Sequence, residues 1–115
     1  IKEEKNIKEK NILILNNDYI SFFPIAVALK KENFILTYCK SFQEAYIELK
    51  QKYDLVVVFD NNFDLDILDF IEYCEDKRLK KIIITSNVDI DNNDYLEKEL
   101  VKNELFNKIV NHIGR

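Results

Sequence analysis

The side chains that could do chemistry in this chain are mostly carboxylates and amides in polar segments that follow apolar runs. Asn16, Asn17 and Asp18 follow the run NILIL, Asp60 follows LVVVF, and SNVDIDNND follows IIIT. Carboxylate oxygens hold Mg²⁺ and accept phosphoryl groups, whereas neutral amides lack the charge for either task. These segments are therefore the first place to look for a site, with their carboxylates weighed against their amides.

Other kinds of site are excluded by residues that the chain lacks. The single glycine, Gly114, stands next to the C-terminus, so no glycine-rich phosphate loop can be written. One histidine, His112, and two cysteines, Cys39 and Cys74, are too few for a structural zinc site or a disulfide framework. We expect no catalytic constellation around His112, and we expect both thiols to be free.

Composition predicts one acidic domain that takes no nucleic acid or membrane as a partner. The chain has 115 residues, 47% of them hydrophobic, and a formal net charge of −4 with only two arginines. Phosphate-binding domains need a surplus of cations, and no run reaches the roughly 20 apolar residues that span a bilayer. We expect a cytoplasmic location and, because the sequence contains no methionine, a piece of a longer protein.

The hydrophobic pattern alternates between strand-length runs and helical spacing. Ser21 is a plausible N-cap that leaves Pro24 in the first turn of its helix, and SFQE at 41–44 predicts a capping box that opens a helix to about Lys50. We expect strands at 11–15, 34–39, 55–59, 82–85 and, briefly, 95–96, with further helices over 67–74 and around Leu105, Ile109 and Ile113. This alternation indicates an α/β three-layer sandwich with a five-stranded parallel sheet. Ligands bind such sheets at the carboxyl ends of the strands, which here lead into 16–21, 59–66 and 85–88.

The segments ILILNND, YDLVVVFD, IIITS and DYLEK, in this order over residues 11–113, resemble the receiver domain of bacterial two-component response regulators. The resemblance implies a flavodoxin-like strand order for a domain at 11–115, after a charged lead-in or linker at 1–10. It also implies an acidic pair after the first strand that holds Mg²⁺, and an aspartate at the end of the third strand that accepts a phosphoryl group.

The chain departs from the family at all three acidic positions. Asn16 and Asn17 match the acidic pair, and the register counted from both flanks places Phe59 at the phosphoacceptor position. Two amides and a phenyl ring remove the ligands and the charge that the reaction needs. Asp60 is the alternative acceptor, although successive strand side chains point to opposite faces, so a shift of one residue aims the carboxylate away.

Other positions of the family pattern are retained. By the resemblance, Thr85 matches the hydroxyl residue that ends the fourth strand, Tyr95 the aromatic residue that reports activation, and Lys98 the lysine after the fifth strand. Each residue also has a plain structural alternative. Thr85 can cap a loop, Tyr95 can fill the core beside the sheet, and Lys98 can lie at the solvated start of a helix.

The segment between the fourth and fifth strands is too short for the family's fourth helix, because Lys98 follows Thr85 by only 13 positions. We expect that helix to be absent or much shortened. We also expect the sheet flank near Ile82, Ile84 and Leu96 to need another cover, either the loop or a partner, and to support self-association.

Three functions remain open on this sequence. The first is a pseudo-receiver, a protein-interaction or regulatory module without enzymatic activity or cofactor. The second is a phosphoaccepting receiver that uses Asp60 and Mg²⁺. The third is a flavodoxin-like domain that binds a small ligand, although NNDYISFF lacks the Gly, Ser and Thr that hold a phosphate.

Overall fold

The computed structural model describes residues 9–16, 19–59, 66–85, 95–97 and 101–114, which form five strands and four helices. In chain order these are β1 (Lys10–Leu15), α1 (Tyr19–Lys31), β2 (Phe34–Cys39), α2 (Phe42–Glu48), β3 (Leu55–Phe59), α3 (Asp66–Asp76), β4 (Lys81–Thr85), β5 (Tyr95–Glu97) and α4 (Val101–Ile113). Every strand pair is parallel, and the strand order is β2-β1-β3-β4-β5. The predicted α/β fold with a flavodoxin-like sheet is confirmed.

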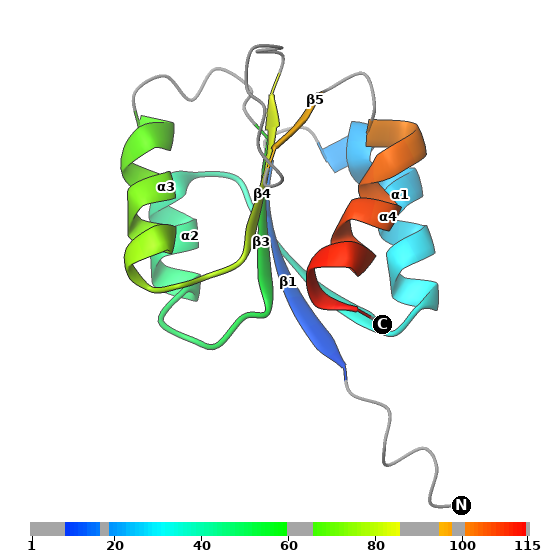
Figure 1. The fold of residues 1–115 in the computed structure, drawn as a ribbon, viewed down its shortest axis with the longest axis horizontal. Helices are drawn as coiled ribbons and strands as arrows, with labels where there is room; N and C mark the ends of the chain where they lie inside the picture. Colours follow the sequence, from blue (N-terminus) through cyan, green and yellow to red (C-terminus); the bar gives the residue numbers. More distant parts are fainter. Residues whose placement is uncertain (1–8, 17–18, 60–65, 86–94, 98–100, 115) are drawn as a thin grey trace, which may run out of the picture.

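The helices cover both faces of the sheet, with α1 and α4 on one side and α2 and α3 on the other (Figure 1). This arrangement follows from the right-handed crossover that joins neighbouring parallel strands. The chain moves from β1 to β2 in one direction along the sheet and from β2 through β3 to β4 in the opposite direction. The crossover helix α1 therefore lies on one face, and α2 and α3 lie on the other.

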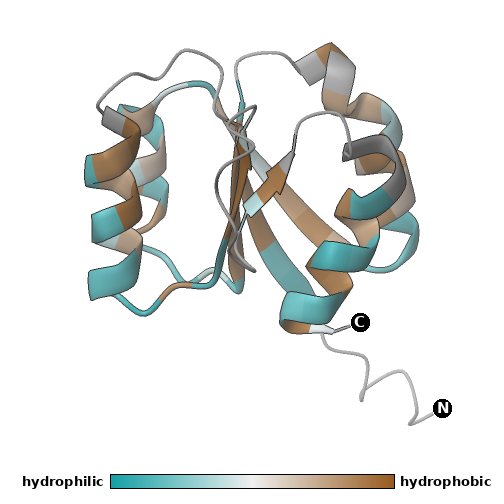
Figure 2. Ribbon diagram, turned by 45° about the horizontal axis from the view of Figure 1, so that its top comes forward, coloured by the Kyte–Doolittle hydropathy of each residue, from teal (hydrophilic) through white to brown (hydrophobic). Residues whose placement is uncertain are grey.

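Alternation along the strands divides the core into two apolar clusters. Side chains of one parity lie under α1 and α4, and those of the other parity lie under α2 and α3. The first cluster includes Ile12, Ile14, Leu55, Val57, Ile82 and Ile84, and the second includes Leu13, Leu15, Val56, Val58 and Ile83. Figure 2 shows the central strands brown along most of their length, as expected for strands with helices on both faces. Each of these buried side chains stabilises the fold by about 1.5–3 kcal/mol relative to an exposed one.

The predicted start of the first helix is wrong. α1 begins at Tyr19, so Ser21 lies inside the helix and Pro24 is an interior residue rather than a first-turn residue. Proline has no N–H to donate to the carbonyl of Ile20, four residues earlier, and its ring crowds that carbonyl. The burial of Phe22, Ala26 and Leu29 against the sheet outweighs this local cost of about 3 kcal/mol.

The second helix begins where the capping pattern places it. The Ser41 side-chain oxygen accepts a hydrogen bond from the backbone N–H of Glu44 at 3.2 Å. The Glu44 carboxylate reaches back one residue further than in a standard capping box and accepts from the N–H of Lys40 at 2.8 Å. α2 ends at Glu48, two residues earlier than predicted.

The predicted bare flank near Ile82, Ile84 and Leu96 is also wrong, because all three side chains are buried within the single chain. They belong to the cluster under α1 and α4, to which α4 contributes Leu105 and Ile109. A helix joining β4 to β5 by a right-handed crossover would lie on the other face, beside α3. The described part of the chain has no helix between β4 and β5, and residues 86–94, which join these strands, lie outside the described residues.

Candidate functional site

The predicted site lies at the carboxyl ends of β1, β3 and β4. The sheet register pairs Leu15 with Val58 and Phe59 with Ile84, so Asn16, Phe59 and Thr85 all stand at this edge. Asn17, Asp60 and Lys98 lie outside the described residues. These three side chains determine what chemistry the described residues at the carboxyl ends of the strands can support.

Phe59, at the position of the expected phosphoacceptor, is a core residue. Its side chain is only 6% exposed, and its ring meets the ring of Phe22 edge to face, with centroids 5.4 Å apart and an interplanar angle of 88°. Such pairs contribute about 0.5–1.5 kcal/mol beyond the area they bury. Phe22 makes a second edge contact with Tyr38, so the Phe59 ring belongs to an aromatic group beneath α1.

Asn16 continues the strand geometry of β1 for one more residue. Its backbone N–H donates to the carbonyl oxygen of Cys39 at 3.1 Å, and the residue is almost completely buried. An amide carries no net charge at any ordinary pH, so burying it at this position costs less free energy than burying a carboxylate. Position 16, where the resemblance led us to look for an acid, is therefore neutral and buried.

Thr85 and Tyr95 lie on the opposite face of the sheet from Phe59. Tyr95 pairs with Ile83 and packs against the cluster under α2 and α3, and Thr85 has the same parity as Ile83 along β4. Thr85 is buried and Tyr95 is half-buried. The predicted brief strand at 95–96 is confirmed and extends to Glu97.

The described residues assemble no acidic centre. Among them, no group of three or more His, Cys, Asp and Glu side chains is arranged to hold a metal ion. A bound Mg²⁺ needs several hard oxygen ligands. Asn16, Phe59 and Thr85 together supply an amide, a ring and a hydroxyl.

Both cysteines are free and buried, as the sequence predicted. Burial raises the pKa of the Cys39 thiol to about 11, with a further contribution from Glu48, and raises that of Cys74 to about 12. A thiol with such a pKa is almost entirely protonated at neutral pH and is a poor nucleophile or metal ligand. The two residues act as small apolar side chains in the layer under α2 and α3.

The sequence prediction overlooked the other end of the sheet. A pocket of about 200 Å³ lies where β1, β3 and β4 begin, and its wall includes Lys10, Arg78 and Lys80. The run KRLKK at 77–81 was the available signal. Runs of cations are common on solvated surfaces. The sequence alone does not show that β1 places Lys10 beside the run at 77–81.

Sequence comparison found no relative of this chain. No protein-family model matches the chain, and no curated protein matches its sequence. Within the described ranges, none of the helices has the length and apolar character that crossing a membrane requires.

Proposed function

We propose that this chain is a pseudo-receiver that works as a phosphorylation-independent protein-interaction or regulatory module in bacterial signalling and has no catalytic activity of its own. The observation that carries the proposal is the burial of Phe59. A phenyl ring packed against Phe22 cannot accept a phosphoryl group, and it offers no oxygen ligand to a cation.

The sheet supports the receiver part of the proposal. The strand order β2-β1-β3-β4-β5 is the one that the resemblance implies, and Thr85 and Tyr95 stand at the end of β4 and the start of β5. The same fold serves many unrelated activities, so the proposal depends on the residues at the edge rather than on the fold.

The outer face of α1 supports the interaction part. Ile20, Phe23 and Val27 are 83%, 51% and 39% exposed, and their spacing of three and four residues places them along one side of the helix. We call these three residues the α1 stripe. An exposed apolar row of this kind is typical of a protein-interaction surface.

A second copy of this chain is the partner that fits the α1 stripe. The helix carries no charged residue from Tyr19 to Leu29, although the whole chain has a net charge of −4. Two copies can therefore meet along this helix without bringing like charges together, whereas contact over most of the acidic surface would bring them together.

The experiment that tests the missing switch is incubation with acetyl phosphate and Mg²⁺, followed by intact-mass measurement. We expect no increase in mass, while a receiver with an intact acidic site, treated in parallel, gains one phosphoryl group. A titration with beryllofluoride and Mg²⁺, followed by NMR, should likewise leave the resonance of Thr85 unshifted.

Asp60→Asn is the matched variant for this experiment. A mass increase in the native chain that disappears in Asp60→Asn would replace the proposal with that of a phosphoaccepting receiver. A saturable beryllofluoride shift around Thr85 would have the same meaning.

A further inference from the structure

The pocket at the amino-terminal end of the sheet combines a cavity with a concentration of charge. It has a volume of about 200 Å³, and its wall carries three cations, Lys10, Arg78 and Lys80, and one carboxylate, Asp54. Its formal charge is therefore +2, in a chain whose net charge is −4. The pocket lies at the end of the sheet opposite to Asn16 and Phe59, so it does not depend on the proposed pseudo-receiver role.

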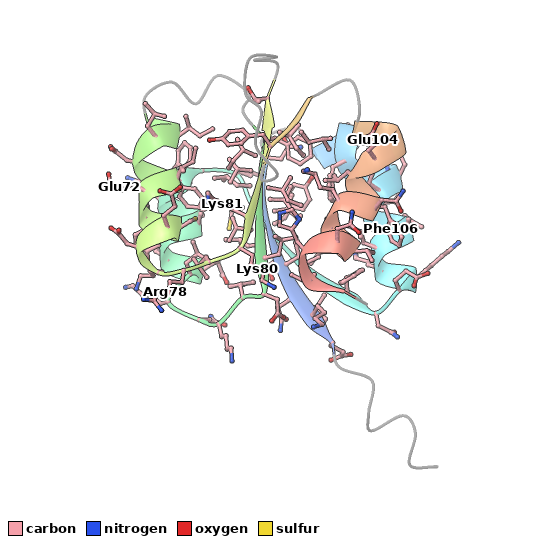
Figure 3. The ribbon with its side chains drawn as sticks, viewed as in Figure 1. Glu72, Arg78, Lys80, Lys81, Glu104 and Phe106 are labelled. Carbon is pink, nitrogen blue, oxygen red and sulfur yellow. The ribbon has the colours of Figure 1, made fainter. Side chains whose placement is uncertain are left out.

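Four separate parts of the fold build this pocket. Lys10 begins β1, Asp54 precedes β3, Arg78 and Lys80 come from the connection between α3 and β4, and Ile113 is the last residue of α4. Figure 3 shows Arg78 below the end of α3 and Lys80 closer to the strands, in the lower half of the molecule. Parallel strands all begin at one end of a sheet, which is why residues distant in sequence meet there.

The connecting segments that lead into β3 and β4 are rich in cations. The connections that enter β3 and β4, residues 49–54 and 77–80, contain five cations and one acid. An anion is therefore attracted to this part of the amino-terminal end of the sheet.

Hydrogen bonds hold the pocket in shape and leave donors for a ligand. Asp54 and Asn11 are joined twice, because the Asn11 N–H donates to Asp54 Oδ2 at 2.7 Å and the Asp54 N–H donates to the Asn11 carbonyl at 2.8 Å. Lys80 Nζ donates to the carbonyl oxygen of His112 at 2.8 Å, which ties the connection before β4 to the end of α4. An ammonium has three donors, so this bond leaves two for a ligand.

Arg78 stands at a backbone position that favours glycine. Its φ is +58°, and the N–H of Leu79 donates to the carbonyl of Cys74 at 2.9 Å, which is the closing bond of a Schellman motif after α3. Glycine adopts this conformation without the cost that a side chain brings. The position gives an unusually clean test, because Arg78→Gly removes the guanidinium and relieves the backbone.

We propose that this pocket binds a small ligand that carries two or more oxyanion groups, either phosphates or carboxylates. The planar guanidinium of Arg78 matches the geometry of either group, and Lys10 and Lys80 supply further charge. The volume of about 200 Å³ lies below the roughly 300–1,000 Å³ of sites for drug-sized ligands. The ligand is therefore small, in the size range of pyrophosphate or citrate.

The test is calorimetric titration of the whole chain with pyrophosphate and, separately, with citrate, at constant ionic strength. We expect saturable binding of at least one of them. Lys80→Gln and Arg78→Gly should each weaken that binding by about tenfold or more, as expected for the loss of a charged hydrogen-bond partner. Arg78→Gly should be at least as stable as the native chain in urea, which separates lost binding from lost folding.

Lys77→Gln is the matched control. Lys77 is exposed and lies over the ring of Tyr73, with Nζ 5.3 Å from the ring centroid, and it does not line the pocket. The substitution removes the same charge from the same connection, and we expect it to change the affinity by less than about twofold.

Asp54→Asn keeps an oxygen for the Asn11 N–H, removes the one negative charge of the pocket wall and should tighten binding.

Three outcomes would overturn the proposal. They are the absence of saturable binding of both anions at millimolar concentrations, an equal loss of affinity in Lys77→Gln and Lys80→Gln, and unchanged affinity in Arg78→Gly. Binding of pyrophosphate alone would identify a phosphate-bearing ligand, and binding of citrate alone would identify a carboxylate-bearing ligand.

Discussion

At the scale of single residues, the packing of Phe59 joins the chemistry of the predicted site to the stability of the fold. The ring packs under α1 against Phe22, within the cluster that holds that layer to the sheet. An ionised carboxylate placed in this apolar cluster would lose its hydration. An aspartate introduced at this position alone should therefore destabilise the fold.

We expect Phe59→Asp to lower the free energy of unfolding by about 4 kcal/mol, because it removes a buried ring and buries a charge. Phe59→Leu should cost about 1–2 kcal/mol. Urea denaturation measures both values. The deficit of Phe59→Asp should shrink as the pH falls, because burial raises the pKa of a carboxyl group and the protonated form is cheaper to bury. Equal losses in the two variants would contradict the packing of Phe59.

The sequence predicted which residues stand at the carboxyl ends of the strands. It did not predict what their side chains contact. The run LVVVF predicted a strand that ends at Phe59, and the structure agrees. Its contact with Phe22 depends on how α1 packs across the sheet, which no local pattern encodes. The burial of Asn16 likewise depends on the neighbouring strands and helices.

At the scale of elements, local signals succeeded where the backbone needs a specific partner. Ser41 was predicted as the start of a helix from its spacing to Glu44, and its side chain makes the expected bond. The start of α1 was predicted wrongly because the cost of Pro24 inside a helix is local, whereas the gain from burying Phe22, Ala26 and Leu29 comes from the sheet.

We expect Ser41→Ala to destabilise the chain by about 1 kcal/mol, because the N–H of Glu44 loses its acceptor at the start of α2. Ser41→Gly is the control and should cost only a few tenths of a kcal/mol, since glycine is tolerated at an N-cap. Thermal and urea denaturation measure the difference. A Ser41→Ala variant as stable as the native chain would show that the Ser41 bond contributes nothing.

At the scale of the whole molecule, the sequence specified the sheet but not the surface. Buried strands that alternate with helices were enough to predict a five-stranded parallel sheet, which the structure has. The flank near Ile82, Ile84 and Leu96 was wrongly predicted to lack cover. A right-handed crossover helix after β4 would lie on the other face of the sheet, and α4 covers these three residues. The basic pocket was missed because its cations come from two distant segments.

We expect the chain to self-associate weakly through the α1 stripe, as measured by sedimentation equilibrium over a range of concentrations. Ile20→Glu should shift the equilibrium to the monomer, because two copies would then bring like charges together. Leu68→Glu is the matched control, since Leu68 is also exposed but lies on α3 in the opposite layer. A monomer at every concentration, or an equal effect of the two substitutions, would remove the α1 stripe from the proposal.

The strand order has one more consequence, for the behaviour of the protein in concentrated solution. β2 stands at the border of the sheet and pairs only with β1 among the described strands, so half of its peptide groups face outward. Its sequence, FILTYC, is uncharged and rich in residues that favour extended chains, which is the profile of a segment that templates fibril growth. Lys40, directly after β2, is the nearest charge that opposes the pairing of β2 with another chain.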